Sequence, residues 1–135
     1  MNEELKKLPH IVKFNEVKYD LHDPWQRFKR SEFHYFLKDK EQGLVAGYWE
    51  AQDGYEDLGK EQDSFHELLL VIEGSLYVRS QNCSQELVAG PGDTVVVVRG
   101  RNIRIIVREP VKVFFVCYPM GTGNAIDDYE KMAKK

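Results

Sequence analysis

The chain has 135 residues and a formal net charge of −3, with 42% hydrophobic and 30% charged residues. This composition is typical of one globular domain, and the acidic balance argues against nucleic acid as a partner, because phosphate binding needs a strong basic patch. No apolar run approaches the roughly 18 residues of a membrane span, and the opening MNEELKKLPH lacks the apolar core of a secretion signal. We expect a cytoplasmic protein with reduced thiols that contacts neither membranes nor nucleic acid.

Helical signals come first along the chain. Residues 2–8 are compatible with one or two helical turns, and Asp23 is a candidate N-cap before Pro24, with Trp25 and Phe28 on one face of a short helix. After this point the chain consists of short segments rich in aromatic and β-branched residues, separated by turn signals such as GPGD. Strands this short and this frequent predict an antiparallel sandwich or barrel.

Two of these segments carry more specific patterns. Ile103, Ile105 and Val107 alternate with arginines, which predicts a strand with one buried face. The valine run at 95–98 does not alternate, which predicts a strand covered on both faces. At the end of the chain Asn124 can cap a helix whose Ile126 and Tyr129 repeat at helical spacing, so this helix should pack on the barrel or on a partner subunit.

Glycine spacing carries a family resemblance. One pattern, G-x5-K-x-Q-x4-E-x6-G, is formed by Gly54, Lys60, Gln62, Glu67 and Gly74. A second, G-x5-V-x-G-x2-I-x3-V, is formed by Gly92, Val98, Gly100, Ile103 and Val107. These spacings resemble the two motifs of the cupin superfamily, G-x5-H-x-H-x4-E-x6-G and G-x5-P-x-G-x2-H-x3-N. Segments such as AGYWEA and HELLLVIEGSLYVR look most similar to the ethanolamine-utilisation cupins and the ureidoglycine-aminohydrolase-like cupins.

The resemblance implies an all-β fold, the double-stranded β-helix or jelly-roll cupin barrel, with short N-terminal helical segments and a C-terminal helix. It places the whole chain, 1–135, in a single cupin domain. The conserved-type barrel would cover about 43–119, with terminal extensions at 1–32 and 120–135. Cupins commonly dimerise by pairing their sheets, so we expect a homodimer that uses apolar surface from residues 32–37 and from the terminal helices.

The sequence departs from the cupin metal site. In metal-binding cupins three histidines and a glutamate converge inside the barrel, and the matching positions here are Lys60, Gln62, Glu67 and Ile103. Of these four ligand positions only the glutamate is retained. Protonated lysine is a poor metal ligand, and isoleucine has no atom that can bind a metal. We therefore expect no metal and no cofactor. The ethanolamine-utilisation relatives also lack the usual histidines, so the departure is compatible with that subgroup.

Two histidines are candidates for substitute ligands. His66 precedes Glu67 on one predicted strand, and strand alternation sends the two side chains to opposite faces. His66 should instead pack or hydrogen-bond beneath a loop or at a subunit interface. His34 remains a candidate for the interior, against the alternative of a partly exposed strand histidine.

Other side chains could replace the metal. We expect the Lys60 ammonium to pair with Glu67, with Gln62 adding an amide; the alternative is a Glu67 exposed at the barrel mouth and a Lys60 in a solvated loop. Tyr48 and Glu50 share a face of the preceding strand, which lines the cavity in resembling proteins. Glu50 and Glu67 would then form a carboxylate pair suited to acid/base chemistry.

Three functions follow from these alternatives. The first is a metal-free cupin that binds, and could transform, a small polar metabolite, with Glu67 and Glu50 as catalytic groups and Lys60, Gln62 and Tyr48 as substrate-binding groups. The second is a non-catalytic sensor or assembly cupin whose old site has decayed. The third is a metal-dependent enzyme with rearranged ligands. The fold does not decide among them, because cupin barrels host many functions.

Overall fold

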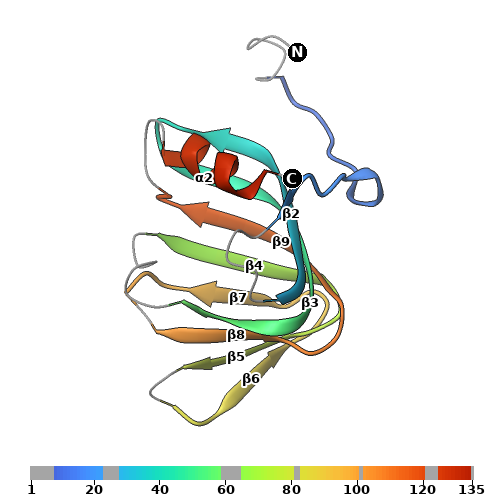
Figure 1. Ribbon diagram of the computed structural model, residues 1–135, viewed down its shortest axis with the longest axis vertical. Helices are drawn as coiled ribbons and strands as arrows, with labels where there is room; N and C mark the ends of the chain where they lie inside the picture. Colours follow the sequence, from blue (N-terminus) through green and yellow to red (C-terminus); the bar gives the residue numbers. More distant parts are fainter. Residues whose placement is uncertain are drawn as a thin grey trace.

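The computed structural model describes residues 8–22, 28–58, 65–80, 83–100, 102–120 and 125–134. Within these ranges the elements are η1 (Phe14–Glu16), β1 (Leu21–His22), β2 (Phe28–Asp39), β3 (Leu44–Leu58), β4 (His66–Glu73), β5 (Leu76–Ser80), β6 (Glu86–Ala89), β7 (Thr94–Val97), β8 (Ile103–Val107), β9 (Val111–Tyr118) and α2 (Ala125–Ala133). Figure 1 shows the strands crossing the molecule one above another, with α2 beside β2 and β9. No helix in the described ranges is long and apolar enough to cross a membrane.

All strand pairs are antiparallel, in the order β6-β5-β8-β3-β9-β4-β7, with β2 on β3 and β1 on β2. The long strand β3 links the two layers, because residues 45–51 pair with β9 and residues 54–58 pair with β8. The result is a nearly closed jelly-roll barrel with one C-terminal helix, which confirms the predicted fold class. Strand pairing also extends upstream of residue 43, where the sequence placed the start of the barrel.

Aliphatic side chains fill the centre of the barrel. The largest side chains under 2% exposed are Leu69, Leu76, Ile126, Val45, Val71, Val107, Val111 and Val113. Beneath α2 the core becomes aromatic, because Tyr129 packs 5.9 Å from the ring of Phe33 and 6.5 Å from that of Tyr35. Ile126 and Ala133 of α2 are fully buried, so the predicted C-terminal helix is attached to its own barrel by an apolar face.

The residues of β3 that point into the barrel are odd-numbered in the first half of the strand and even-numbered in the second half. Val45 and Ala51 are buried, so odd-numbered residues point inward in the first half. Asp53 then adopts a left-handed φ of 30°, a local irregularity of the kind that re-aims side chains. Beyond it Glu56 pairs with Ile105, which is only 3% exposed, so even-numbered residues point inward in the second half.

Two local expectations are corrected. Phe28 begins β2 and does not belong to a helix, because it pairs with Gly54 and packs its ring 5.5 Å from that of Trp49; residues 1–7, 23–27 and Asn124 lie outside the described ranges. The valine run is not covered on both faces. Val97 is buried but Val96 is 65% exposed, because β7 ends the strand order and nothing in the described chain covers its outer face.

Candidate functional site

Glu67 lies near the start of β4 and projects into the barrel. It pairs with Cys117 on β9 and Val97 on β7, and both of these side chains are buried. It shares its face with Leu69, which is 2% exposed, while the side chain of Glu67 itself remains partly accessible. The carboxyl therefore lies on the interior face, at the end of the barrel where β7 and β9 terminate.

This position changes the acidity of the carboxyl. Burial, with a smaller contribution from Glu56, raises the pKa of Glu67 to about 8, since a low-dielectric interior and a like charge both disfavour the ionised form. Glu67 is therefore mostly protonated at neutral pH. In that state it can donate a hydrogen bond, and it has a proton to release when a base or a cation approaches.

Glu56, at the end of β3, is an interior residue that our sequence reasoning missed. It faces the same interior as its ladder partner Ile105. The pKa of the Cys117 thiol is raised by burial first and then by the charges of Glu67 and Glu56. The Asp53–Gly54 dipeptide was the available signal, because it marks a turn or bulge that shifts strand parity.

A phenol completes the interior polar groups. Tyr35 on β2 is 8% exposed, and its pKa is raised above the usual range by burial first, then by Tyr129 and Cys117, with a smaller contribution from Glu67. Four titratable side chains thus line one interior, and the strands β2, β3, β4 and β9 contribute one each: Tyr35, Glu56, Glu67 and Cys117. At neutral pH the thiol and the phenol are uncharged.

The predicted partners Tyr48 and Glu50 do not join Glu67. They are even-numbered residues in the first half of β3, where the odd-numbered side chains point inward, so they lie on the outer face. Tyr48 belongs there to an aromatic cluster, with ring centroids 5.3 Å from Phe14 and from Phe36 and 5.9 Å from Phe114. The expectation that Glu50 and Glu67 share one cavity is wrong.

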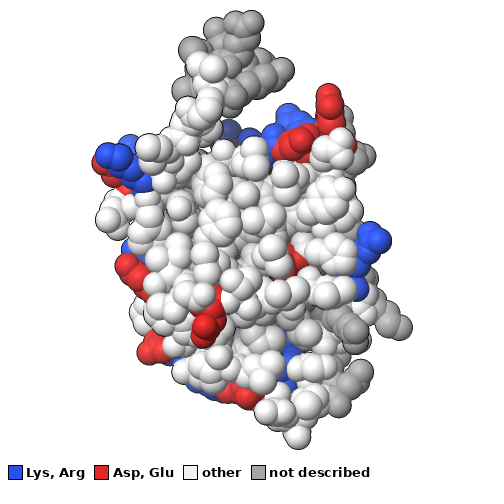
Figure 2. Space-filling view, turned by 180° about the vertical axis from the view of Figure 1, so that it is seen from behind, with Lys and Arg blue, Asp and Glu red and all other residues white. Residues whose placement is uncertain are grey.

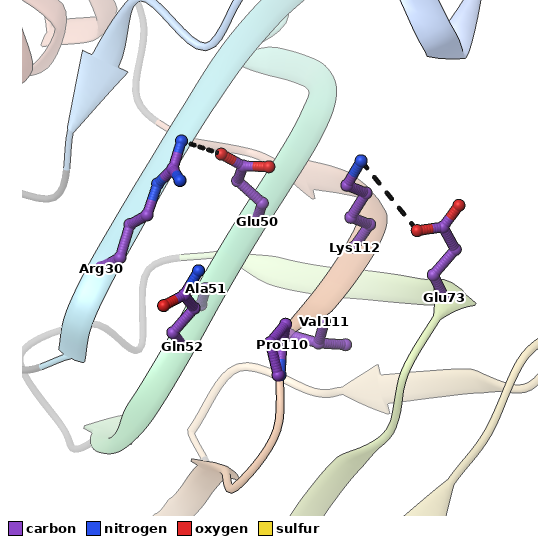
Figure 3. Close-up of a pocket in the computed structure, with 8 residues that line it drawn as sticks. All are labelled: Arg30, Glu50, Ala51, Gln52, Glu73, Pro110, Val111 and Lys112. Atoms are coloured by element: carbon purple, nitrogen blue, oxygen red, sulfur yellow. Dashed lines mark ion pairs between the residues drawn. The ribbon is translucent and has the colours of Figure 1, made fainter.

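Glu50 belongs instead to a row of alternating charges on the outer face. Arg30 Nη2 lies 2.6 Å from Glu50 Oε1, and Lys112 Nζ lies 4.0 Å from Glu73 Oε2. Figure 3 shows these four side chains on β2, β3, β9 and β4 around a cleft of about 130 Å³. Because the cations are ion-paired and the cleft is open to solvent, the row stabilises neighbouring strands modestly.

The remaining predicted site residues lie at the same end of the barrel or outside the described ranges. Lys60 and Gln62 belong to residues 59–64, which the structure does not describe, so the proposed pairing of Lys60 with Glu67 stays a prediction. Ile103, at the third cupin histidine position, packs against the core. Among the described residues there is no group of three His, Cys, Asp or Glu that could hold a metal ion, and the absence of a metal stays a prediction.

Neither candidate histidine points into the barrel. His66 is exposed, and its Nδ1 accepts a hydrogen bond from the backbone N–H of Arg99 at 3.2 Å, which confirms the predicted role beneath a loop. His34 pairs with Tyr48 on the outer face, and its Nδ1 lies 2.9 Å from Asp20 Oδ1. The alternative of a partly exposed strand histidine is therefore the one that holds for His34.

Comparisons with known proteins agree with this geometry. The jelly-roll barrel with Glu67 on its inner face defines a cupin. Residues 6–123 match the family model described as ethanolamine utilisation protein EutQ, and the chain belongs to the EutQ family. A comparison with curated protein sequences finds no match.

Solved structures share the fold at low sequence identity. EutQ from Clostridium difficile superposes with a TM-score of 0.66 at 20% identity, over 82% of this chain and 86% of that one. Ectoine synthase from P. lautus gives 0.65 at 20% identity, over 90% and 86%. The cupin domain of Schizosaccharomyces pombe Cnp3 gives 0.61 at 12% identity, over 91% and 80%. At these identities the likenesses support the cupin fold, and they do not carry a substrate.

Proposed function

We propose that this EutQ-family cupin binds a small polar metabolite inside its barrel, around Glu67 at the end where β7 and β9 terminate, and without a metal ion. The observation that carries the proposal is Glu67 itself. Its carboxyl faces the interior but remains partly accessible, and its pKa is raised by burial to about 8. Perturbed carboxyls in such positions are characteristic of binding and catalytic sites.

The same carboxyl suits acid/base chemistry. A group with a pKa near the working pH is present in both protonation states, so it can accept or deliver a proton during each turnover. The neighbouring Cys117 and Tyr35 hold their protons at neutral pH because burial raises the pKa of both. Glu67 is thus the interior group that this geometry favours for a proton transfer, if the bound metabolite is transformed.

Ligand screening with matched variants tests the proposal. Thermal-shift and calorimetric titrations of the parent with small amines, carboxylic acids and phosphorylated acids should identify a ligand whose binding is lost in Glu67→Gln. Glu50→Gln is the control, because Glu50 is a carboxylate on the outer face of the barrel. A ligand bound equally well by Glu67→Gln and by the parent would contradict the interior site.

Elemental analysis tests the metal-free part separately. We expect substoichiometric transition metal in purified protein and no change in melting temperature on addition of a chelator. Stoichiometric manganese, iron, nickel or zinc that is lost together with ligand binding would favour the metal-dependent alternative.

We also propose a homodimer built on the outer face of the strands β7, β4 and β9. The ladder partners Leu68 and Val96 are 43% and 65% exposed there. Figure 2 shows one side of the molecule, on which most of the visible surface is uncharged and a few acidic side chains lie within it. Exposed apolar area of this kind is typical of protein interfaces. The apolar side of α2 is buried against its own barrel, so the sheet supplies the surface.

We also propose a cytoplasmic location. Cys83 is exposed, Cys117 is buried and neither forms a disulfide, which suits a reducing compartment. Cell fractionation would test the location directly.

A further inference from the structure

Strand β7 lies at one end of the strand order, so one of its edges has no strand partner among the described residues. Its other edge pairs with β4, and the hydrogen bond from Val71 N–H to the backbone oxygen of Asp93, at 2.9 Å, fixes the phase of that ladder. A strand directs the N–H and C=O groups of successive residues to alternate edges. The odd-numbered residues of β7 therefore bond to β4, and Thr94 and Val96 direct their backbone groups to the open edge.

The sequence of this edge favours pairing with another strand. Residues 94–98 read TVVVV, without a charge, a proline or a glycine, and β-branched residues of this kind are enriched in strands. Val96 and Val98 are 65% and 46% exposed. Proteins usually protect an open edge with a charged side chain or a proline, and neither occurs in this stretch. The edge of β7 is thus available to a further strand.

Opposite charges flank the uncharged stretch. Asp93 precedes it and Arg99 follows it, and both residues are exposed. Asp93 Oδ2 accepts a hydrogen bond from the backbone N–H of Gly90, and the backbone N–H of Arg99 donates to His66 Nδ1, so both residues are held at the ends of β7. Within the described ranges neither side chain forms an ion pair. Six residues of extended chain, roughly 20 Å, separate the two charges, which is too far for them to pair within one chain.

We propose that a second copy of this chain adds its β7 antiparallel to this edge, about a two-fold axis at Val96, so that one sheet continues through both barrels. This inference rests on the proposed homodimer and states how its two copies meet. In this register Thr94 lies opposite the partner's Val98, and Asp93 lies opposite the partner's Arg99.

Both the backbone and the charges select this register. Residues that direct their backbone groups to the open edge must lie opposite one another if they are to exchange hydrogen bonds, and centring the pair on Val96 satisfies this condition. Side chains directly opposite one another have Cβ atoms about 5 Å apart, so the charges of Asp93 and the partner's Arg99 are within reach of an ion pair. The two-fold axis forms this ion pair twice. Any other register that keeps the hydrogen bonds moves the opposite charges apart.

Two variants with reversed charges test the pairing by sedimentation equilibrium. Arg99→Glu places two carboxylates opposite each other, and Asp93→Lys places two cations opposite each other, so each variant should dimerise at least about tenfold more weakly than the parent. An equimolar mixture of the two variants should form a heterodimer with close to parental affinity, because each lysine then lies opposite a glutamate. Glu109→Lys is the control, since it reverses an exposed charge in the turn between β8 and β9, and it should leave dimerisation unchanged.

A second pair of variants separates edge pairing from packing between outer faces. Val96→Pro removes the N–H that points to the open edge but keeps an apolar side chain, and proline is tolerated where the N–H of an edge strand faces outward. We expect this variant to be a folded monomer by circular dichroism and sedimentation. Val96→Thr keeps the N–H and the side-chain shape, and it should remain a dimer.

The outcomes distinguish this inference from the proposed homodimer. A monomeric parent would overturn both. A dimeric parent whose affinity is the same in Arg99→Glu, Asp93→Lys and Val96→Pro would overturn the pairing of β7 and leave a dimer that packs through its outer faces. Failure of the mixed variants to form a heterodimer would overturn the register, even if each variant alone is monomeric.

Discussion

Glu67 on β4 and Cys117 on β9 are ladder partners, and both side chains face the barrel interior. The pair shows how the fold sets the chemistry of this end of the barrel, because the same burial raises the pKa of the carboxyl to about 8 and that of the thiol well above its usual value. An acid whose pKa is higher in the folded state than in the unfolded chain binds its proton more tightly when folded. The stability of the protein must therefore depend on pH through Glu67.

The raised pKa of Glu67 fixes the direction in which stability changes with pH. Between pH 4.5, the ordinary value for a glutamate, and about pH 8 the folded protein keeps the Glu67 proton while the unfolded chain loses it. The free energy of unfolding should therefore fall as pH rises through this window, with a contribution from Glu67 of at most about 1.4 kcal/mol per pH unit. Urea unfolding at several pH values measures the slope.

Two variants test whether the pH dependence of the unfolding free energy comes from Glu67. Glu67→Gln cannot ionise, so its unfolding free energy should fall less steeply from pH 5 to pH 8 than that of the parent. Glu50→Gln, on the outer face, should keep the parent slope. Equal slopes in Glu67→Gln and the parent would show that Glu67 is not protonated in the folded protein at neutral pH.

The outer face of β4 and β7 yields a prediction about assembly. Val96→Asp places a charge at the centre of the proposed interface, where desolvating an unpaired carboxylate would cost more than the contact gains. We expect a dimeric parent and a monomeric variant with a similar melting temperature for the barrel, measured by light scattering and circular dichroism. Val88→Asp on β6 is the matched control, since Val88 is 60% exposed on a strand outside this face; a monomeric parent would contradict the proposal.

Much of the fold was predictable because its signals are local. The glycine frame sets the turns, and the alternation of Ile103, Ile105 and Val107 sets the buried face of β8, which the structure confirms. The C-terminal helix was likewise predictable from the spacing of Ile126 and Tyr129. The start of β2 at Phe28 was not, because pairing with β3 overrode a local helix signal.

The candidate site was less predictable for one physical reason. Glu67 was assigned to the interior by spacing and lies there, but the inward parity of β3 changes near Asp53. The resemblance of residues 46–51 to a strand that lines the cavity in similar proteins put Glu50 inside, and Glu56 was not considered. A single backbone irregularity decides which glutamate faces the core, and a dipeptide that marks a turn does not reveal whether strand pairing continues through it.

The close packing around Gly47 leaves no room for a side chain, so a substitution there should destabilise the fold. A Cβ at this position would lie 2.0 Å from the backbone oxygen of His34 and 3.0 Å from Phe115 Cζ. Gly47→Ala should therefore force β2 away from β3 and reduce the unfolding free energy by at least about 2 kcal/mol. Gly90→Ala is the control, because the nearest atom, Asp93 Oδ2, is 3.9 Å away; chemical denaturation of both variants compares the two, and equal stabilities would contradict the close approach.

Helix α2 is held against the barrel both by apolar packing and by surface ion pairs, and the two contributions to stability can be compared. Lys38 Nζ lies 2.6 Å from Glu130 Oε2 and Lys40 Nζ lies 2.7 Å from Asp127 Oδ2, but these side chains are about a third to a half exposed. Ile126 is fully buried. Ile126→Ala should therefore cost about 2–5 kcal/mol of stability, whereas each ion pair should contribute less than about 1 kcal/mol.

A double-mutant cycle isolates the ion-pair contribution. Lys38→Met, Glu130→Gln and the double variant, measured by urea unfolding in low and high salt, should give a small coupling energy that salt reduces further. The loss in Ile126→Ala should not depend on salt, because burial of apolar area carries no charge to screen. A coupling energy as large as the Ile126→Ala loss would mean that charge, and not the apolar face, holds α2 against the barrel.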